Sequence, residues 1–285
     1  ATPFGIAVVH SCFNVAATLV LLPFSNGLVK LACLTLPTHE DVKEMSETDK
    51  TLSLLDPRFL DTPAYAVEQS RQVASVMADK SRKAMELAME LLQRYDEAKA
   101  EQVIQMETDV DRFEDELGTY LVKLSSRQLS GKDSETLNTI LHCIGDFERI
   151  SDHARNVKEA AQEMYDKKLD FSDKAQEELK VFERAVHDIL DITMNSFIKG
   201  DLNLARQVEP MEEVIDGLSL DVKQRHVRRL RKGKCTIELG FILSDVITNF
   251  ERVSDHCSNI AVCLVQVNED EFDTHAYLDE LRQED

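Results

Sequence analysis

The chain has 285 residues, of which 33 are Lys or Arg and 53 are Asp or Glu, so its formal net charge at pH 7 is −20. This charge disfavours nucleic acid as a partner, because nucleic-acid binding needs Lys and Arg to neutralise phosphates. It also disfavours direct capture of free phosphate unless a metal ion intervenes. With nine Gly, six Pro and few runs rich in β-branched residues, the composition favours helices over strands.

The first apolar segment, 4–24, contains no Asp, Glu, Lys or Arg and as a helix is about as long as a bilayer is thick. No basic residues precede it, so a signal peptide is disfavoured. We predict a membrane-spanning helix whose polar side chains, His10 and Asn14, face other helices or a transport pathway. A helix buried in a soluble domain is the alternative, because these residues dilute the apolar run. A polar, acidic linker is expected over 38–62.

Apolar residues spaced three and four apart predict six amphipathic helices after the linker. Their expected bounds are 63–95, 97–129, 133–167, 173–199, 201–231 and 235–268. Asp96 and Asp201 are suitable N-caps. Gly131 and Gly233 suit helix ends, and Gly200 suits a link between helices.

Two segments about a hundred residues apart repeat an unusual polar pattern. They are Asp146-Phe-Glu-Arg-Ile-Ser-Asp-His-Ala-Arg-Asn-Val157 and Asn249-Phe-Glu-Arg-Val-Ser-Asp-His-Cys-Ser-Asn-Ile260. Seven of the twelve positions are identical, and they include polar residues that packing alone has little reason to repeat. The similarity extends upstream, so the chain is predicted to contain two tandem three-helix bundles, 63–168 and 169–285. In the second copy Pro210 replaces Gln105 and should kink or restart the fifth helix.

Each repeat contains two pairs of carboxylates four residues apart, and such pairs lie on one face of a helix. The pairs are Glu107 with Asp111, Glu148 with Asp152, Glu212 with Asp216, and Glu251 with Asp255. The two carboxylates of a pair repel each other. A divalent or trivalent cation bound between them makes the arrangement favourable, because carboxylate and amide oxygens are hard ligands. We therefore predict these eight residues as metal ligands, with Asn156 and Asn259 as auxiliary ligands.

The carboxylates of the third-helix motif are expected on the side of the helix away from its apolar stripe. That direction excludes a di-iron bundle, whose ligands project inward and include Glu-x-x-His. His153 and His256 are expected to be hydrogen-bonded neighbours, with a role as metal ligands as the alternative, and Arg149 and Arg252 are expected to be counter-ions. A solvated acidic face without metal remains the alternative. The sequence shows no nucleophile with a general base and no phosphate-cradling Gly loop, so it predicts no enzyme.

One basic cluster, 225–232, ends the fifth predicted helix. Its simplest role is to complement the helix dipole, and docking to anionic lipid or a partner is the alternative. The six cysteines show no C-x-x-C spacing. They are expected to be reduced packing residues on the cytosolic side of a membrane.

The pattern Phe-Glu-Arg-(Ile/Val)-Ser-Asp-His-x-x-Asn on the third helix of a duplicated bundle resembles the PhoU family, over about 63–268. The resemblance implies surface metal clusters held by Glu/Asp-x-x-x-Asp pairs, and a role in regulating phosphate uptake and signalling. It implies Glu148, Asp152, Glu251 and Asp255 as ligands more securely than the pairs on the preceding helix. Iron and zinc are the favoured ions.

The segments 7–24 and 28–32 and the motif over 54–63 resemble the end of the membrane domain of bacterial Na⁺/phosphate cotransporters, some of which carry a PhoU-like domain at their C-terminus. The Gln-Ser-Ser repeats of their transport core are absent here. The resemblance implies that 1–37 ends a truncated membrane domain in the bacterial inner (cytoplasmic) membrane, with residues from about 38 onward cytosolic. Na⁺ and phosphate would be the transported species of the intact protein, and its own upstream transport domain the partner.

Two further interpretations stay open. One is a PhoU-type regulator that acts on a separate transporter or on a histidine kinase. The other is a helical interaction module without metal. Self-association, for instance as a homodimer, is left open by the sequence.

Overall fold

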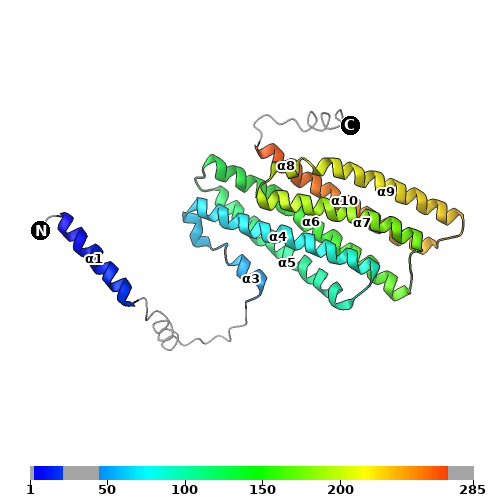
Figure 1. The fold of residues 1–285 in the computed structure, drawn as a ribbon, viewed down its shortest axis with the longest axis horizontal. Helices are drawn as coiled ribbons and strands as arrows, with labels where there is room; N and C mark the ends of the chain where they lie inside the picture. The colour runs from blue at the N-terminus through cyan, green and yellow to red at the C-terminus, as the bar shows by residue number, and fades with distance from the viewer. Residues whose placement is uncertain (1–2, 22–44, 269–285) are drawn as a thin grey trace. The chain divides into compact units, whose positions relative to one another are not determined.

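The computed structural model describes residues 3–21 and 45–268, which are helical with short connections and contain no strand (Figure 1). The all-α prediction is therefore confirmed for these residues. Helix α1 (Pro3–Leu21) belongs to one compact unit, and the residues from Glu47 onward belong to another.

The membrane-spanning helix predicted over 4–24 is not supported. Among the residues that the structure describes, no helix combines the length and apolarity needed to cross a membrane. The last residues of that segment, 22–24, lie outside the described part, as does 25–44. His10 and Asn14 are exposed on α1.

The described part of the second unit contains six long helices. They are α4 (Pro63–Gln93), α5 (Glu97–Ser125), α6 (Gly131–Lys167), α7 (Asp173–Lys199), α9 (Val208–Arg231) and α10 (Ile237–Asn268). Five agree with the predicted helices to within a few residues at each end. The predicted 201–231 helix is divided into α8 (Leu202–Ala205) and α9. Pro210 lies in the first turn of α9, where its missing N–H costs no hydrogen bond, so the predicted restart is confirmed.

The expected helix ends are found with one exception. The carboxylates of Asp96 and Asp201 accept the backbone N–H groups of their first turns, and Gly200 and Gly233 adopt positive φ angles of 66° and 63°. Gly131 does not end a helix as predicted. It begins α6, because the hydroxyl of the preceding Ser130 accepts the N–H of Asp133 and caps that helix.

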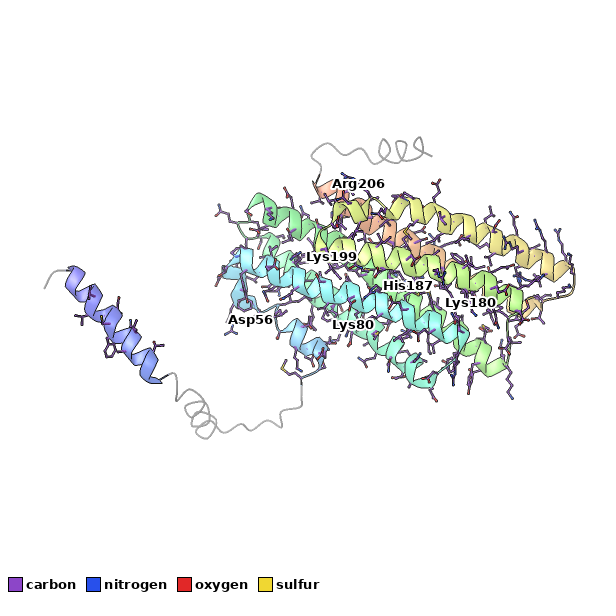
Figure 2. The ribbon with its side chains drawn as sticks, in the orientation of Figure 1. Asp56, Lys80, Lys180, His187, Lys199 and Arg206 are labelled. Carbon is purple, nitrogen blue, oxygen red and sulfur yellow. The ribbon has the colours of Figure 1, made fainter. Side chains whose placement is uncertain are left out.

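The second half of the predicted linker, 38–62, packs on the bundle. It forms α3 (Glu47–Leu52) and the 3₁₀ helix η2 (Pro57–Asp61), and it buries Leu52, Leu55 and Leu60. Lys80 of α4, labelled in Figure 2, donates to the hydroxyl of Thr48 in α3 over 3.1 Å. These contacts attach residues 47–61 to the first repeat.

The helices of the two repeats pack along two lines, α6 against α10 and α4 against α7. The buried Phe147 and Phe250 occupy matched positions in the duplicated motif, and each ring lies edge-on to a phenylalanine of α7, with centroids 4.9 Å and 5.4 Å apart. The motif therefore runs along the core between the repeats.

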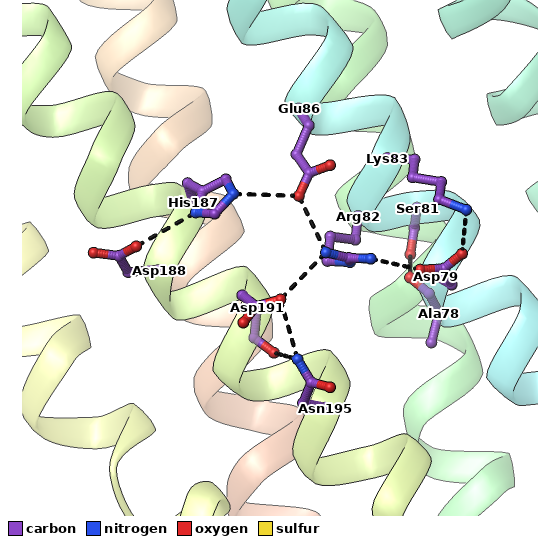
Figure 3. A network of polar contacts seen from close by, with 10 residues as sticks. All are labelled: Ala78, Asp79, Ser81, Arg82, Lys83, Glu86, His187, Asp188, Asp191 and Asn195. Carbon is purple, nitrogen blue, oxygen red and sulfur yellow. Dashed lines mark hydrogen bonds and ion pairs between the residues drawn. The ribbon is translucent and has the colours of Figure 1, made fainter.

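A polar network joins α4 to α7 on the outside of this core (Figure 3). The guanidinium of Arg82 contacts Asp79 at 2.7 Å on its own helix and Asp191 of α7 at 3.2 Å. His187 of α7 lies 3.6 Å from a carboxylate oxygen of Glu86. Charged pairs at this exposure contribute little individually, so the α4–α7 contact depends mainly on the apolar residues beneath them.

Candidate functional site

The duplicated motifs on α6 and α10 meet each other directly. Nδ1 of His153, on α6, lies 2.8 Å from Oδ1 of Asn249 on α10, and the amide Nδ2 of Asn156 donates to the same oxygen over 3.1 Å. One acceptor of the second repeat thus serves two donors of the first.

The reciprocal arrangement is present in the other direction. Nδ1 of His256, on α10, lies 2.8 Å from Oδ1 of Asp146 on α6, and Nδ2 of Asn259 donates to that oxygen over 3.2 Å. Asp146 and Asn249 are equivalent positions of the two repeats, so the network has an approximate two-fold relationship. The histidines are hydrogen-bonded neighbours, as predicted. The amide nitrogens of Asn156 and Asn259 are used in this network, and their role as auxiliary metal ligands stays a prediction.

In the first repeat, Glu148 and Asp152 of α6 are electrostatic neighbours, and Glu114 of α5 lies near both Glu148 and Asp111. The side chain of Glu148, on α6, is 21% exposed. Burial, followed by the neighbouring Asp152 carboxylate, raises the pKa of Glu148 to about 7. Glu114 of α5 adds to this shift through its negative charge. Glu107, by contrast, accepts from Arg155 of α6 over 2.9 Å. The structure therefore places Glu114, which the sequence reasoning missed, opposite Glu148.

The predicted carboxylates of the second repeat are also near one another. Burial raises the pKa of Asp216, on α9, and the charges of Asp255 and Glu251 on α10 raise it further. Burial, followed by the charge of Asp216, likewise raises the pKa of Glu212 to about 7. The four predicted residues of this repeat are therefore electrostatic neighbours across the α9–α10 contact.

The two repeats differ in how the motif glutamate is neutralised. Glu251 accepts from Lys223 over 2.7 Å and from the hydroxyl of Ser219 over 2.6 Å, both on α9. At the offset of 105 that aligns α5 with α9, Glu114 takes the place of Ser219 and Gly118 takes the place of Lys223. The second repeat therefore has a lysine beside its motif glutamate where the first has a glycine, and the first has a further carboxylate, Glu114, where the second has a serine.

These clusters offer hard oxygen donors to a cation. In residues 45–268, no three Asp, Glu, His or Cys side chains converge closely enough to form a preorganised metal site. The donor set nevertheless suits a divalent or trivalent ion, because burial and negative neighbours raise the pKa values of Glu148 and Asp216 even though Arg149 and Lys223 lie nearby. Binding of a cation would displace protons from Glu148 and Glu212.

Residues 74–161 and 180–264, which together make up more than half of the chain, match the PhoU domain family. The chain belongs to this family. One matched segment spans parts of α4 to α6, and the other runs from α7 into α10. The PhoU resemblance of the sequence is thus confirmed. The match begins at residue 74 and gives no support to the cotransporter resemblance of the N-terminal segment.

Relatives of known description agree with this assignment. A Thermotoga maritima protein described as phosphate-specific transport system accessory protein PhoU homolog 1 is 25% identical over 174 residues, covering 61% of this chain and 74% of the relative. An Aquifex aeolicus PhoU homolog is 23% identical over 215 residues, covering 75% and 96%. The crystal structure of PhoU from Pseudomonas aeruginosa superposes with a TM-score of 0.66 at 21% identity, covering 70% of this chain and 96% of that one. This structural likeness shows a PhoU fold.

Proposed function

We propose that this chain is a PhoU-type regulator of phosphate transport that binds metal ions at its duplicated acidic clusters. The observation that carries the proposal is the pair of acidic clusters, one in each repeat, each of which contains a glutamate, Glu148 or Glu212, with a raised pKa. PhoU homologues named as accessory proteins of phosphate transport support the regulatory part.

The acidic clusters suggest how metal occupancy would change the protein. A bound cation supplies positive charge to carboxylates that otherwise repel each other across the contact of α5 with α6 or of α9 with α10. Removal of that repulsion stabilises the helix pair, and the surface carried by the pair then differs between the loaded and the unloaded protein. A transporter or a kinase that contacts one of these surfaces would then bind the loaded and the unloaded protein with different affinities.

The metal part is tested by elemental mass spectrometry after reconstitution with iron, manganese or zinc. The variant Glu148→Gln/Asp152→Asn should lose the metal of the first repeat. The matched control is Glu97→Gln/Glu101→Gln, since these carboxylates are also four residues apart on α5 but are exposed. Loss of metal in the first variant alone supports the proposal. Absence of metal from the unaltered protein, or equal loss in both variants, contradicts it.

The regulatory part is tested by the phosphate uptake rate of cells that carry the unaltered gene, the Glu148→Gln/Asp152→Asn variant, or neither. A rate that changes with the variant, at equal protein level, supports regulation through the metal site. An unchanged rate in the deletion strain contradicts a role in phosphate transport.

The uncharged segment 4–24 favours a second candidate, in which the same domain is the cytosolic end of a Na⁺-dependent phosphate transporter. Membrane fractionation of the protein with and without residues 1–46 distinguishes the two. Membrane association that is lost on deletion supports attachment to a transporter. Identical fractionation of both forms leaves the separate regulator as the better candidate.

A further inference from the structure

Basic side chains gather at the end of α9, in a chain whose net charge is strongly negative. Arg228, Lys232 and Lys234 come from the end of α9 and the residues after it, and Lys174 comes from the first turn of α7. All four are exposed, and none forms an ion pair or side-chain hydrogen bond with the part of the chain that the structure describes. Together with Arg229 they line a pocket of about 330 Å³. This group is called the basic pocket below.

The backbone holds the basic pocket in place. The N–H groups of Gly233 and Lys234 donate to the carbonyls of Leu230 and Arg229, both over 3.0 Å. With Gly233 at a φ of 63°, these bonds close α9 in a Schellman motif and direct the chain sharply away from the helix axis. Lys232 and Lys234 are therefore fixed on either side of the turn.

The N-terminus of α7 adds a second source of positive potential. Helices α7 and α9 are adjacent, and Figure 1 shows the start of α7 and the end of α9 at the same end of the bundle. The N-cap of α7 is Ser172, whose side chain makes no capping hydrogen bond. The pocket thus contains the positive end of a long helix dipole whose N-cap hydroxyl is not used.

Arg229 provides a donor that the protein itself does not use. Its side chain is 14% exposed, and Nη1 is held by Glu178 at 2.6 Å. Its Nη2 is buried and has no hydrogen-bond partner. A buried N–H without an acceptor is costly, so this side chain would gain from a shift that brings Nη2 to an anion in the pocket.

Complementing the helix dipole does not require this many charges. The dipole of α9 amounts to about half an elementary charge at its C-terminus. Five cations line the pocket, and they are offset only in part by Asp173 in the lining and by Glu178, which pairs with Arg229. The overall charge of −20 does not cancel them, since salt screens charges beyond about 8 Å at physiological ionic strength. The local excess of positive charge fits an anion.

We propose that the basic pocket binds a small, multiply charged anion that carries phosphate groups, such as an inorganic diphosphate. Guanidinium groups donate to phosphate oxygens in a planar fork, and lysines add point charges. The pocket volume lies near the lower end of the range for small-molecule sites, about 300–1,000 Å³. A lipid headgroup offers the same phosphate chemistry from a membrane surface. The site is independent of the acidic clusters and of any metal bound there.

The test is isothermal titration calorimetry with inorganic pyrophosphate, on the whole chain after removal of metals with a chelator and dialysis. This treatment excludes binding through a metal at the acidic clusters. The variant is Lys232→Ala/Lys234→Ala, which removes exposed, unpaired side chains and should fold normally. The control, Lys123→Ala/Lys132→Ala, removes the same charge from exposed positions of the first repeat.

We expect saturable binding with one site per chain, at least about tenfold weaker in the Lys232/Lys234 variant, since each charge-assisted contact contributes more than a neutral one. The control variant should bind like the unaltered protein. In a second arm, co-sedimentation with phosphatidylglycerol vesicles is compared with phosphatidylcholine vesicles. Pyrophosphate binding identifies a soluble anion, and binding to the anionic vesicles alone identifies a headgroup. No binding in either arm, or equal weakening in both variants, overturns the proposal.

Discussion

His153 and His256 occupy the same position in the two repeats, and their imidazole rings lie 5.5 Å apart across the α6–α10 contact, with planes inclined by 31°. Each ring is hydrogen-bonded to the opposite repeat, His153 to Asn249 and His256 to Asp146. Burial, together with the nearby His256, lowers the pKa of His153 even though its bond to Asn249 raises it. The contact is therefore built around a neutral His153.

Removal of the shared acceptor should uncouple the repeats. Asp146→Ala leaves His256 and Asn259 without their partner, and we expect a loss of about 1–3 kcal/mol in unfolding free energy. Chemical denaturation measures it. In a double-mutant cycle, Asp146→Ala should couple to His256→Ala and not to His153→Ala, which bonds to the other acceptor. Additive effects of Asp146→Ala and His256→Ala would show that this bond contributes no stability.

Acidification should lower the free energy of unfolding, because His153 becomes protonated. A folded pKa below the ordinary 6.5 means that the unfolded state binds more protons in the window between the two values. The contribution of His153 to the free energy of unfolding is therefore fully present above pH 6.5, and it is lost as the pH falls through this window. His153→Gln should flatten this part of the curve of unfolding free energy against pH. A curve of unchanged slope would assign the acid sensitivity to other groups.

Glu183 should make the protein less stable as the pH rises, which is the opposite of the effect of His153. This buried glutamate of α7 accepts from Gln93 over 2.7 Å, its other oxygen has no partner, and burial raises its pKa to about 7. Between its ordinary value and about 7 the folded state retains a proton that the unfolded state releases, so stability falls as the pH rises. Glu183→Gln should therefore stabilise the protein by up to about 3 kcal/mol at pH 8, and by nothing at pH 4. The exposed Glu177→Gln serves as the control and should have no effect at either pH.

Lys223 should compete with metal in the second repeat. It supplies the positive charge beside Glu251, and the ion pair itself is too exposed to contribute much stability. Lys223→Ala should raise the affinity of the second repeat for a divalent cation while unfolding free energy changes by less than about 1 kcal/mol. Calorimetric titration with Mn²⁺ or Zn²⁺ measures this, with Lys199→Ala as a control at an exposed lysine. Weaker metal binding by the Lys223 variant would contradict the role of Lys223 as an internal counter-ion.

Gly240 and Gly145 should respond to alanine with opposite signs. A Cβ at Gly240 would lie 2.7 Å from Nε2 of the buried His226, whereas a Cβ at Gly145 meets nothing within 4 Å. Gly145→Ala should stabilise α6 by up to about 1 kcal/mol, the difference in helix propensity. Gly240→Ala should be destabilising, and His226→Ala in the same chain should remove most of that penalty. Thermal unfolding of the four proteins provides the comparison, and equal effects of the two alanines would contradict the clash.

The helices and their buried faces could be predicted because the spacing of apolar residues that marks them is a property of each helix alone. The same spacing places the two carboxylates of each predicted pair on one face of a helix. Which helix faces which could not be predicted in this way, and so Glu114 and Lys223 were missed, although both lie one or two turns from a predicted ligand. The repeated His and Asn pointed to a shared role, but only the α6–α10 contact shows that the role is to join the repeats. Leu52, Leu55 and Leu60 were apolar residues inside a supposed linker, and their spacing was a usable indication that it packs.

The crossed hydrogen bonds between Asp146, Asn249 and their partners have a consequence for how the molecule comes apart. Each repeat holds the acceptor that the other repeat's donors need, so neither half is complete as an isolated piece. The duplicated bundle should melt in one cooperative transition. Separately produced halves would each expose their acceptor and donors beside apolar residues. On mixing they should reassociate in the native register, in which each acceptor meets the donors of the other half.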